Sequence, residues 1–292
     1  TMLSITNPKD KVVIFSPFYE NYGADTILSG AEPIYVPLVP PDFTFSIEQL
    51  ENAFKQGAKA LILCNPSNPC GKVFTFEELT AIADVVKKYD AYVVTDEVYE
   101  HIVYAPNKHI YMQALDGMRE RTIVCNSLSK TYSITGWRLG YVIANPEIID
   151  RVKKVHDFLT VGAAAPLMEA ATVGLKFDDK YYDELAAHYA HMKEVFVGGL
   201  EKLGLKYTDP QGAYYVLVDV SEFGVKDDVK FCEWLAQYVG VAAVPGSSFF
   251  REDVNNLIRF HFAKQDDTLN EAINRLAGLR KAVAEAGDVE WR

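Results

Sequence analysis

The sequence predicts an α/β protein in which a mostly parallel open sheet, flanked by helices, is followed by a smaller C-terminal α+β domain. Short β-rich runs alternate with helical patterns through the first half of the chain, which favours a parallel sheet. The run KALILCN, at 59–65, is almost continuously apolar, as is typical of a strand buried on both faces. In the second half the helical and strand patterns are segregated, which is typical of an α+β domain.

Expected strands and helices alternate as far as residue 144. The expected strands are 11–17, 32–38, 59–65, 91–97, 122–127 and 137–144. The expected helices cover 19–30, 46–57 and the segment that runs to about Tyr89. Gly57 is expected to end the second of these helices, and Thr75 with Glu78 forms a capping box that begins the third.

The second half begins with two long helical stretches. The expected elements are helical stretches at 146–176 and 178–203, a strand at 212–220, a helix at 227–239, a strand at 257–263 and a last helix to about 286. No Gly/Ser linker or internal repeat separates the two halves. We therefore expect two closely packed domains with a boundary near 177–185, so that residues 1–180 form the large domain and residues 181–292 the small one.

Composition narrows the classes of partner and compartment. The 292-residue chain is 49% hydrophobic, enough for a sizeable core, and its net charge of −11 disfavours a general nucleic-acid or anionic-membrane surface. Its cysteines, which form no C-x-x-C pair, are Cys64, Cys70, Cys125 and Cys232. This pattern favours the reducing cytoplasm. No apolar run approaches the roughly 18 residues that cross a bilayer, and no signal peptide is evident.

Polar residues follow several of the expected strands. Ligands of open α/β sheets bind outside the carboxyl ends of the strands. Three runs lie there: NPSNPCG (65–71), DEVY (96–99) and SLSK (127–130), and RFHFA (259–263) is an expected strand itself. Each has an ordinary alternative when taken alone, because Asp96 could cap a helix, Lys130 could be a solvated lysine, and the Asn-Pro turns could form a tight loop.

Together these runs match one chemical requirement. A phosphorylated pyridine aldehyde needs an amine nucleophile, a carboxylate for its ring nitrogen, hydroxyl or amide donors for its phenolate, and cationic and hydroxyl groups for its phosphate. With its motifs in this order and spacing, the chain resembles the fold-type I pyridoxal-phosphate-dependent enzymes of the class I/II aminotransferase family. The resemblance covers essentially all 292 residues.

The resemblance implies roles for the residues around the cofactor ring. Lys130 would form the Schiff base with pyridoxal 5'-phosphate and then move the substrate α-proton. Asp96 would pair with the ring nitrogen and keep it protonated through a charge-assisted bond. Tyr99 and Asn68 would bind the phenolic oxygen, and Asn68 would also face the substrate.

The family resemblance also implies which residues would contact the phosphate, the face of the ring and the substrate. Ser127 and Arg138 would bind the phosphate, and Tyr19 would stack on the ring. Arg259 would clamp the substrate α-carboxylate, since its planar fork matches that group. Two alternatives stay open, namely that Tyr19 is an ordinary core aromatic and that Arg259 closes an internal salt bridge.

The sequence departs from the family pattern at two places. Cys70 replaces the usual Thr of the Asn-Pro-Thr-Gly turn, so a neighbouring hydrogen bond is expected to change while Asn68 stays in place. The segment TMLSITNPKD resembles the last turn of a helix that ends before Pro8. We therefore expect an N-terminally incomplete chain that lacks a substrate-covering arm and a glycine-containing phosphate loop and binds the cofactor weakly; a frayed tail is the alternative.

Three other features are weaker signals. His188 and His191 lie three residues apart on an expected helix, but no third ligand is evident, so we interpret them as solvated and expect no metal site. The run PGSSFF (245–250) either orders a loop near the substrate or is a plain turn. The run LTVGAAAP (159–166) is placed to reach the site of a partner subunit.

The implied activity is ping-pong transamination between an L-amino acid and a 2-oxo acid, of the aspartate or aromatic type. The family resemblance also implies a homodimer with sites at the interface. Alternatives left open are a C–S β-lyase on the same scaffold, a non-catalytic sensor module, and a cofactor-free remnant. The sequence does not indicate which amino acid or oxo acid is used.

Overall fold

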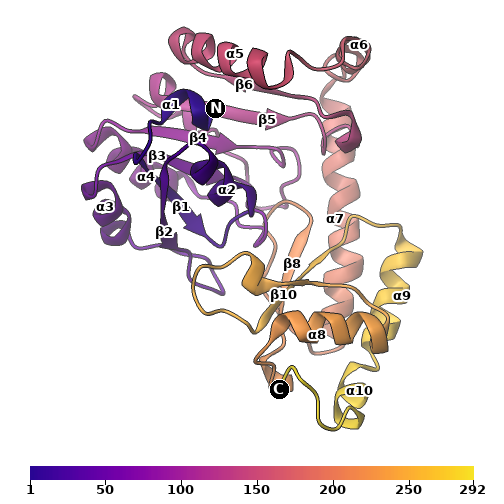
Figure 1. Cartoon of the computed structure of the whole chain (residues 1–292). Helices are drawn as coiled ribbons and strands as arrows, with labels where there is room; N and C mark the ends of the chain where they lie inside the picture. The colour runs from indigo at the N-terminus through magenta and orange to yellow at the C-terminus, as the bar shows by residue number, and fades with distance from the viewer.

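A six-stranded sheet forms the first part of the molecule (Figure 1). The computed structural model describes residues 1–292. The strands are β1 (Lys11–Ser16), β2 (Glu32–Pro37), β3 (Ala58–Cys64), β4 (Tyr92–Asp96), β5 (Thr122–Ser127) and β6 (Gly140–Ile143). Their order is β2-β1-β3-β4-β5-β6, and every pair is parallel except β5–β6. The predicted mostly parallel open sheet is confirmed.

Helices cover both faces of this sheet because its central strands are apolar on both sides. The helices of this part are α1 (Met2–Ile5), α2 (Asn21–Leu28), α3 (Ile47–Lys55), α4 (Phe76–Lys88), α5 (Pro146–Thr160) and α6 (Ala165–Gly174). On β3, Leu61 belongs to the core cluster on one face and Ile62 to the cluster on the other. The capping box of α4 is confirmed, since Thr75 Oγ accepts from Glu78 N at 3.2 Å and Glu78 Oε2 accepts from Thr75 N at 3.0 Å.

The second part is a four-stranded antiparallel sheet packed against helices. Its strands, in the order β7-β8-β10-β9, are β7 (Lys206–Tyr207), β8 (Tyr215–Asp219), β10 (Leu257–His261) and β9 (Val244–Pro245). Its helices are α7 (Asp179–Lys202), α8 (Asp228–Trp234), α9 (Asp266–Leu276) and α10 (Leu279–Glu285). The long helix α7 runs from the first part to the second (Figure 1). Neither α7 nor any other helix has the combination of length and apolar composition needed to span a bilayer.

Three expected helices are interrupted. The stretch 146–176 is wrong as a single helix: α5 ends at Thr160, Val161 adopts a φ of 64°, and the chain turns through Gly162 before α6 begins. The last helix breaks between α9 and α10, next to Gly278. The helix expected at 227–239 changes from α8 to a π-helical turn, Leu235–Val239.

The strand expected at 137–144 is shorter and begins only at Gly140. A 3₁₀ turn, Thr135–Trp137, precedes it, and Arg138 lies in the left-handed region with a φ of 57°. This conformation turns the chain before β6, so the chain returns antiparallel to β5. Arg138 therefore lies on the loop between the strands and not within the sheet.

The two parts are joined by backbone and apolar contacts. Phe18 N donates to Phe249 O at 2.9 Å, and Gln211 N donates to Gly71 O at 2.9 Å. Phe249 and Leu257 belong to the same core cluster as the residues that line the first sheet. The segments that follow β1 and β3 are thus held against the second part, and the two parts meet at the carboxyl ends of the parallel strands.

Candidate active site

Asp96 is a buried carboxylate at the carboxyl end of β4. Its Oδ2 accepts a hydrogen bond from Tyr22 Oη at 2.7 Å, and its Oδ1 accepts one from Val98 N at 3.2 Å. Burial raises the pKa of Asp96, while these two donors and the charge of Lys130 oppose that rise. No Lys or Arg forms an ion pair with Asp96. Because a carboxylate offers about four acceptor positions, Asp96 can still accept a charged donor.

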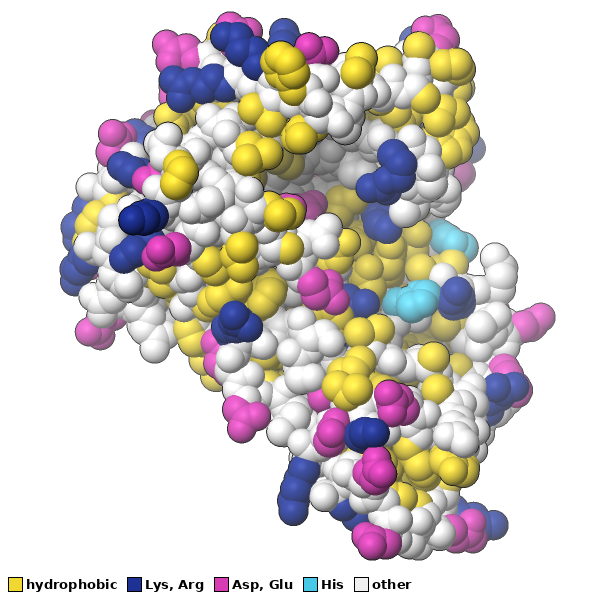
Figure 2. Space-filling model, viewed as in Figure 1, with side chains coloured by type: hydrophobic (Ala, Val, Ile, Leu, Met, Phe, Trp, Pro, Cys, Tyr) yellow, Lys and Arg dark blue, Asp and Glu magenta, His cyan; other side chains and the backbone are white.

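A cavity of about 740 Å³ opens at the ends of β4 and β5. Tyr19, Asp96 and Ser127 line it, together with Tyr22 and the first residues of the chain. Its volume lies in the range of pockets that hold small ligands. Figure 2 shows that the molecule is also hollowed between its two parts, with Lys or Arg side chains and two His side chains beside the hollow.

Lys130 lies in the loop that follows β5 and is half-buried. Burial lowers the pKa of Lys130, and the neighbouring charge of Arg138 lowers it further, whereas Asp96 raises it. No carboxylate forms a salt bridge with this lysine. A lysine that loses its proton more readily than usual is suited to act as a nucleophile or as a base, so this environment differs from that of a solvated lysine.

Ser127 and Arg138 bring anion-binding groups to the same loop. Ser127 Oγ donates to Ser129 Oγ at 2.7 Å and accepts from Ser129 N at 3.1 Å. Arg138 is exposed, and its Nη1 donates to the carbonyl of Thr135 at 2.8 Å. No carboxylate pairs with Arg138, so its other donors are free for an anion such as a phosphate.

Tyr19 precedes α2 and lies at the wall of the cavity. Its side chain is 36% exposed, so it is not a core aromatic. Its ring is 5.7 Å from that of Tyr22 in an edge-to-face arrangement. Burial raises the pKa of Tyr19, and Asp96 and Arg138 lie close enough to influence it as well.

Arg259 reaches the site from β10 in the second part. Its Nη1 donates to Asn68 Oδ1 at 2.6 Å, and Asn68 is buried. Its guanidinium lies 4.4 Å from the ring centre of Tyr215 and 4.3 Å from that of Phe249. Since no carboxylate pairs with Arg259, the structure does not contain the internal salt bridge considered as an alternative. Phe249 belongs to the 245–250 turn, which therefore packs against this arginine.

Three more tyrosines lie around the candidate site. They are Tyr99 and two residues that the sequence analysis missed, Tyr215 and Tyr22. Tyr99 is buried, and its hydroxyl lies 2.9 Å from that of Tyr215. Tyr215 was hidden in the apolar run of β8. Tyr22 was missed although it follows Tyr19 by three residues in the sequence, a spacing that places two side chains on the same side of a helical turn.

Several residues lie outside this constellation. Cys70 Sγ donates to Ser67 Oγ at 3.3 Å, while the neighbouring Asn68 contacts Arg259. His188 is exposed, as is His191, whose Nε2 lies 2.8 Å from Asp266 Oδ2.

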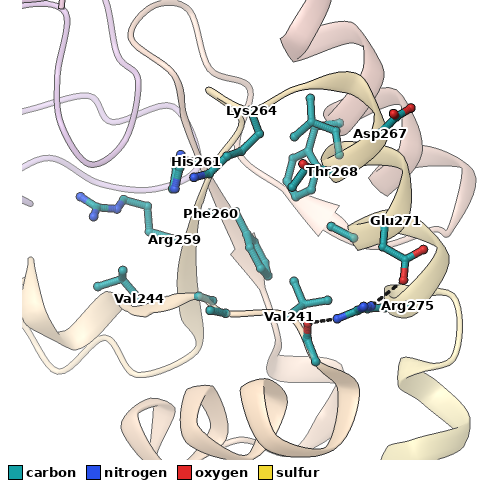
Figure 3. Close-up of a pocket in the computed structure, with 16 residues that line it drawn as sticks. Val241, Val244, Arg259, Phe260, His261, Lys264, Asp267, Thr268, Glu271 and Arg275 are labelled. Atoms are coloured by element: carbon teal, nitrogen blue, oxygen red, sulfur yellow. Dashed lines mark hydrogen bonds and ion pairs between the residues drawn. The ribbon is translucent and has the colours of Figure 1, made fainter. Parts of the chain in front are cut away.

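A second cavity, of about 720 Å³, lies between β10 and α9. In Figure 3, Arg259 and Phe260 point to opposite sides of β10, and Arg275 at the far end binds Glu271. Arg259 therefore stands at the edge of this cavity, while its guanidinium belongs to the site at the end of the parallel strands.

Comparisons with known proteins identify the family of this chain. The sequence model of the family described as "Aminotransferase class I and II" matches residues 1–276. A probable N-succinyldiaminopimelate aminotransferase of Mycobacterium tuberculosis is 35% identical, with 97% of this chain and 74% of that protein covered. Kynurenine–oxoglutarate transaminase 3 of Homo sapiens is 34% identical, with 93% and 66% covered.

Solved structures give the same result. The structure of N-succinyldiaminopimelate aminotransferase from Mycobacterium tuberculosis superposes with a TM-score of 0.92 at 35% identity, over 95% of this chain and 73% of that one. The structure of a methionine aminotransferase from Escherichia coli gives 0.90 at 32% identity, over 94% and 73%. The predicted family and the predicted transfer of amino groups are confirmed. This chain belongs to the class I and II aminotransferase family, and it is a transaminase.

Proposed function

We propose that this transaminase uses pyridoxal 5'-phosphate, bound in the cavity at the ends of β4 and β5, to exchange an amino group between an L-amino acid and a 2-oxo acid. One observation carries the proposal: Asp96 ends β4 and Lys130 lies in the loop after the adjacent strand β5, close enough for each to shift the pKa of the other. Neither is neutralised by a fixed ion pair.

The residues present fit this cofactor. Asp96 is a buried acceptor with unused lone pairs, as a protonated ring nitrogen requires. Arg138 and Ser127 supply a guanidinium and a hydroxyl for a phosphate. Asn68 uses its carbonyl oxygen for Arg259, which leaves its amide N–H groups free to donate to a phenolic oxygen.

The mechanism assigns the proton and binding steps to this chain's own residues. When bound, pyridoxal phosphate supplies an aldehyde that takes up amino groups and a ring that withdraws electrons from the substrate Cα. The Lys130 amine would take the proton from the substrate Cα as general base and would later give it up as general acid. Asp96 would hold the proton on the ring nitrogen, and Tyr99 would donate to the phenolic oxygen.

Arg259 orients the substrate. Its fork can bind an α-carboxylate with two parallel bonds, while Tyr215 and Phe249 keep the guanidinium plane in place. Tyr19 lines the cavity and would cover one face of the ring. Arg259 would recognise the α-carboxylate of any amino acid and so does not select among them. We propose that the substrates are of the aspartate or aromatic type.

A spectroscopic titration tests the function. Pyridoxal phosphate added to the purified chain should give an absorbance band that changes on addition of an L-amino acid and is restored by a 2-oxo acid. Without an oxo acid, conversion should stop at one equivalent per site. Continuous release of pyruvate and ammonia without an acceptor would contradict transamination and indicate a β-lyase.

We further propose that the chain forms a homodimer through the region of α5 and α6. Phe158 is 91% exposed and Val161 is 83% exposed, and Val173 and Leu175 are also exposed nearby. Apolar surface of this kind is typical of a protein interface. Light scattering should show a dimer that Phe158→Asp weakens; an unchanged mass for this variant would place the interface elsewhere.

The domain limits and compartment are also proposals. We place the large domain at residues 1–180 and the small domain at 181–292, because the C-terminal half of α7 contributes Phe196 and Leu200 to the core of the second part. The four unpaired cysteines support a reducing compartment such as the cytoplasm.

A further inference from the structure

We propose that Tyr22 is a positioning residue, whose phenol fixes the Asp96 carboxylate in the orientation and the ionised form that the ring-nitrogen contact requires. The proposal rests on the proposed function, since it deepens the role of Asp96. Tyr22 itself does not touch the reacting atoms in this account. It acts through Asp96 alone.

The geometry gives each carboxylate oxygen of Asp96 one donor. Tyr22 Oη donates to Oδ2 at 2.7 Å, and the backbone N–H of Val98 donates to Oδ1 at 3.2 Å. The Val98 donor follows from the turn after β4, whereas the Tyr22 donor comes from α2, and Tyr22 lies 74 residues before Asp96 in the chain. Tyr22 is therefore the one side chain that ties the orientation of Asp96 to a second element of the fold.

Tyr22 is itself held in place. Its side chain is only 9% exposed and packs in the same core cluster as Ile14 and Ile62. The ring of Tyr19 meets it edge-to-face at 5.7 Å. A phenol so confined cannot swing away from its acceptor without opening this cluster.

The charges around Asp96 explain why a permanent donor matters. Burial disfavours its ionised form, the neighbouring Glu97 disfavours it further, and Lys130 favours it. The other titratable groups that face it are the Tyr19 phenol and the Cys64 and Cys125 thiols. The Lys130 amine is engaged in the chemistry, so its charge is not a constant partner for Asp96.

Tyr22 is a constant partner because it does not ionise in the working range. Burial, followed by the charge of Asp96, raises the pKa of Tyr22 well above its ordinary value. Its hydroxyl therefore remains a donor between pH 5 and pH 8. Loss of this donor should raise the pH at which Asp96 takes up a proton.

Tyr22→Phe tests the proposal, since it removes the hydroxyl and keeps the ring. Tyr35→Phe is the matched control, because Tyr35 packs against Phe18 beside α2 without contacting Asp96. The affinity for pyridoxal phosphate should be measured between pH 5 and pH 8. We expect Tyr22→Phe to bind about 10- to 100-fold more weakly at the acid end, the size of effect expected for a lost hydrogen bond to a charged group. The difference should shrink toward pH 8, and Tyr35→Phe should follow the unmodified chain.

A second readout does not depend on the cofactor. In the cofactor-free protein, the carboxyl ¹³C signal of Asp96, assigned with Asp96→Asn, should titrate at a higher pH in Tyr22→Phe than in the unmodified chain. An unchanged Asp96 titration in Tyr22→Phe, or cofactor affinity equal to that of the unmodified chain at every pH, would overturn the proposal and leave Tyr22 as a packing residue. If the unmodified chain bound no cofactor while the Asp96 titration shifted as expected, the proposed function would fail and the Tyr22–Asp96 coupling would stand.

Discussion

The ends of β4 and β5 lie side by side yet are built in opposite ways. At the end of β4, Asp96 is buried and held by donors on two sides. In the loop that leads from the end of β5 to β6, Arg138 is exposed, lies in the left-handed region and bonds only to the carbonyl of Thr135. The contrast indicates that the ring-binding half of the site is organised by the protein before a ligand arrives, whereas the phosphate-binding half keeps its donors free for the ligand.

The largest expected effect on activity comes from a substitution in the ring-binding half of the site. Asp96→Ala removes the carboxylate that stabilises the protonated ring, so turnover should fall by about 10²-fold or more, which corresponds to about 3 kcal/mol of transition-state stabilisation. Steady-state transaminase assays measure this, with the exposed Asp84→Ala as control. A near-normal rate for Asp96→Ala would show that the carboxylate is structural and would remove the contrast.

A substitution of Arg259 tests whether this residue of β10 binds the substrate independently of the cofactor-binding residues at the ends of β4 and β5. Arg259→Lys keeps the charge and loses the fork, so KM for amino acids should rise by about 10- to 100-fold, equivalent to the loss of one charge-assisted bond of about 1.5–3 kcal/mol. The Kd for pyridoxal phosphate should stay unchanged. Equal losses of substrate and cofactor affinity would mean that Arg259 supports the whole site structurally.

A substitution in the phosphate-binding half of the site should have a smaller effect, on the affinity for the cofactor. Arg138→Ala removes one free guanidinium from the phosphate contact, so the Kd for pyridoxal phosphate should rise by about tenfold, while binding of the phosphate-free aldehyde pyridoxal should not change. Equilibrium titrations of both ligands decide this. An equal loss for the two ligands would indicate that Arg138 shapes the loop and does not bind phosphate.

The smallest expected effect is a shift in a pH profile. Arg138 helps to lower the pKa of Lys130, so Arg138→Leu should raise that pKa. The amine attacks the aldehyde only when it is neutral, and the rate of cofactor attachment should therefore reach its plateau at a higher pH in the variant. Stopped-flow absorbance between pH 6 and pH 10 would detect the shift. A profile that moved to lower pH would contradict the electrostatic assignment.

The β4 and β5 ends could be predicted from sequence because they follow from local patterns. Apolar strand runs locate Asp96 and Ser127, and parallel strands must bring their carboxyl ends to one edge. Tyr22 and Tyr215 could not be found in this way, since their contacts depend on how α2 packs and on the pairing of β8 with β10. The turn at Arg138 was also missed, because its left-handed conformation is set by the path between β5 and β6 and not by residue type.

Contacts across the two parts of the chain were the hardest to predict. Arg259 and Asn68 are 191 positions apart, and their 2.6 Å hydrogen bond exists only because β10 is placed against the loop that follows β3. The interruption of the expected helix at Val161 had a local signal in Gly162 and Pro166, but the helical period on both sides favoured a single helix.

We propose that Lys130 is the amine that reacts with the cofactor. Covalent trapping identifies the reactive amine directly. The chain is incubated with pyridoxal phosphate, reduced with borohydride, digested and mapped by mass spectrometry. We expect the phosphopyridoxyl group on Lys130 and on no other lysine, with loss of the label in Lys130→Ala. A label on a different lysine, or an equal label in Lys130→Ala, would show that another amine reacts with the cofactor.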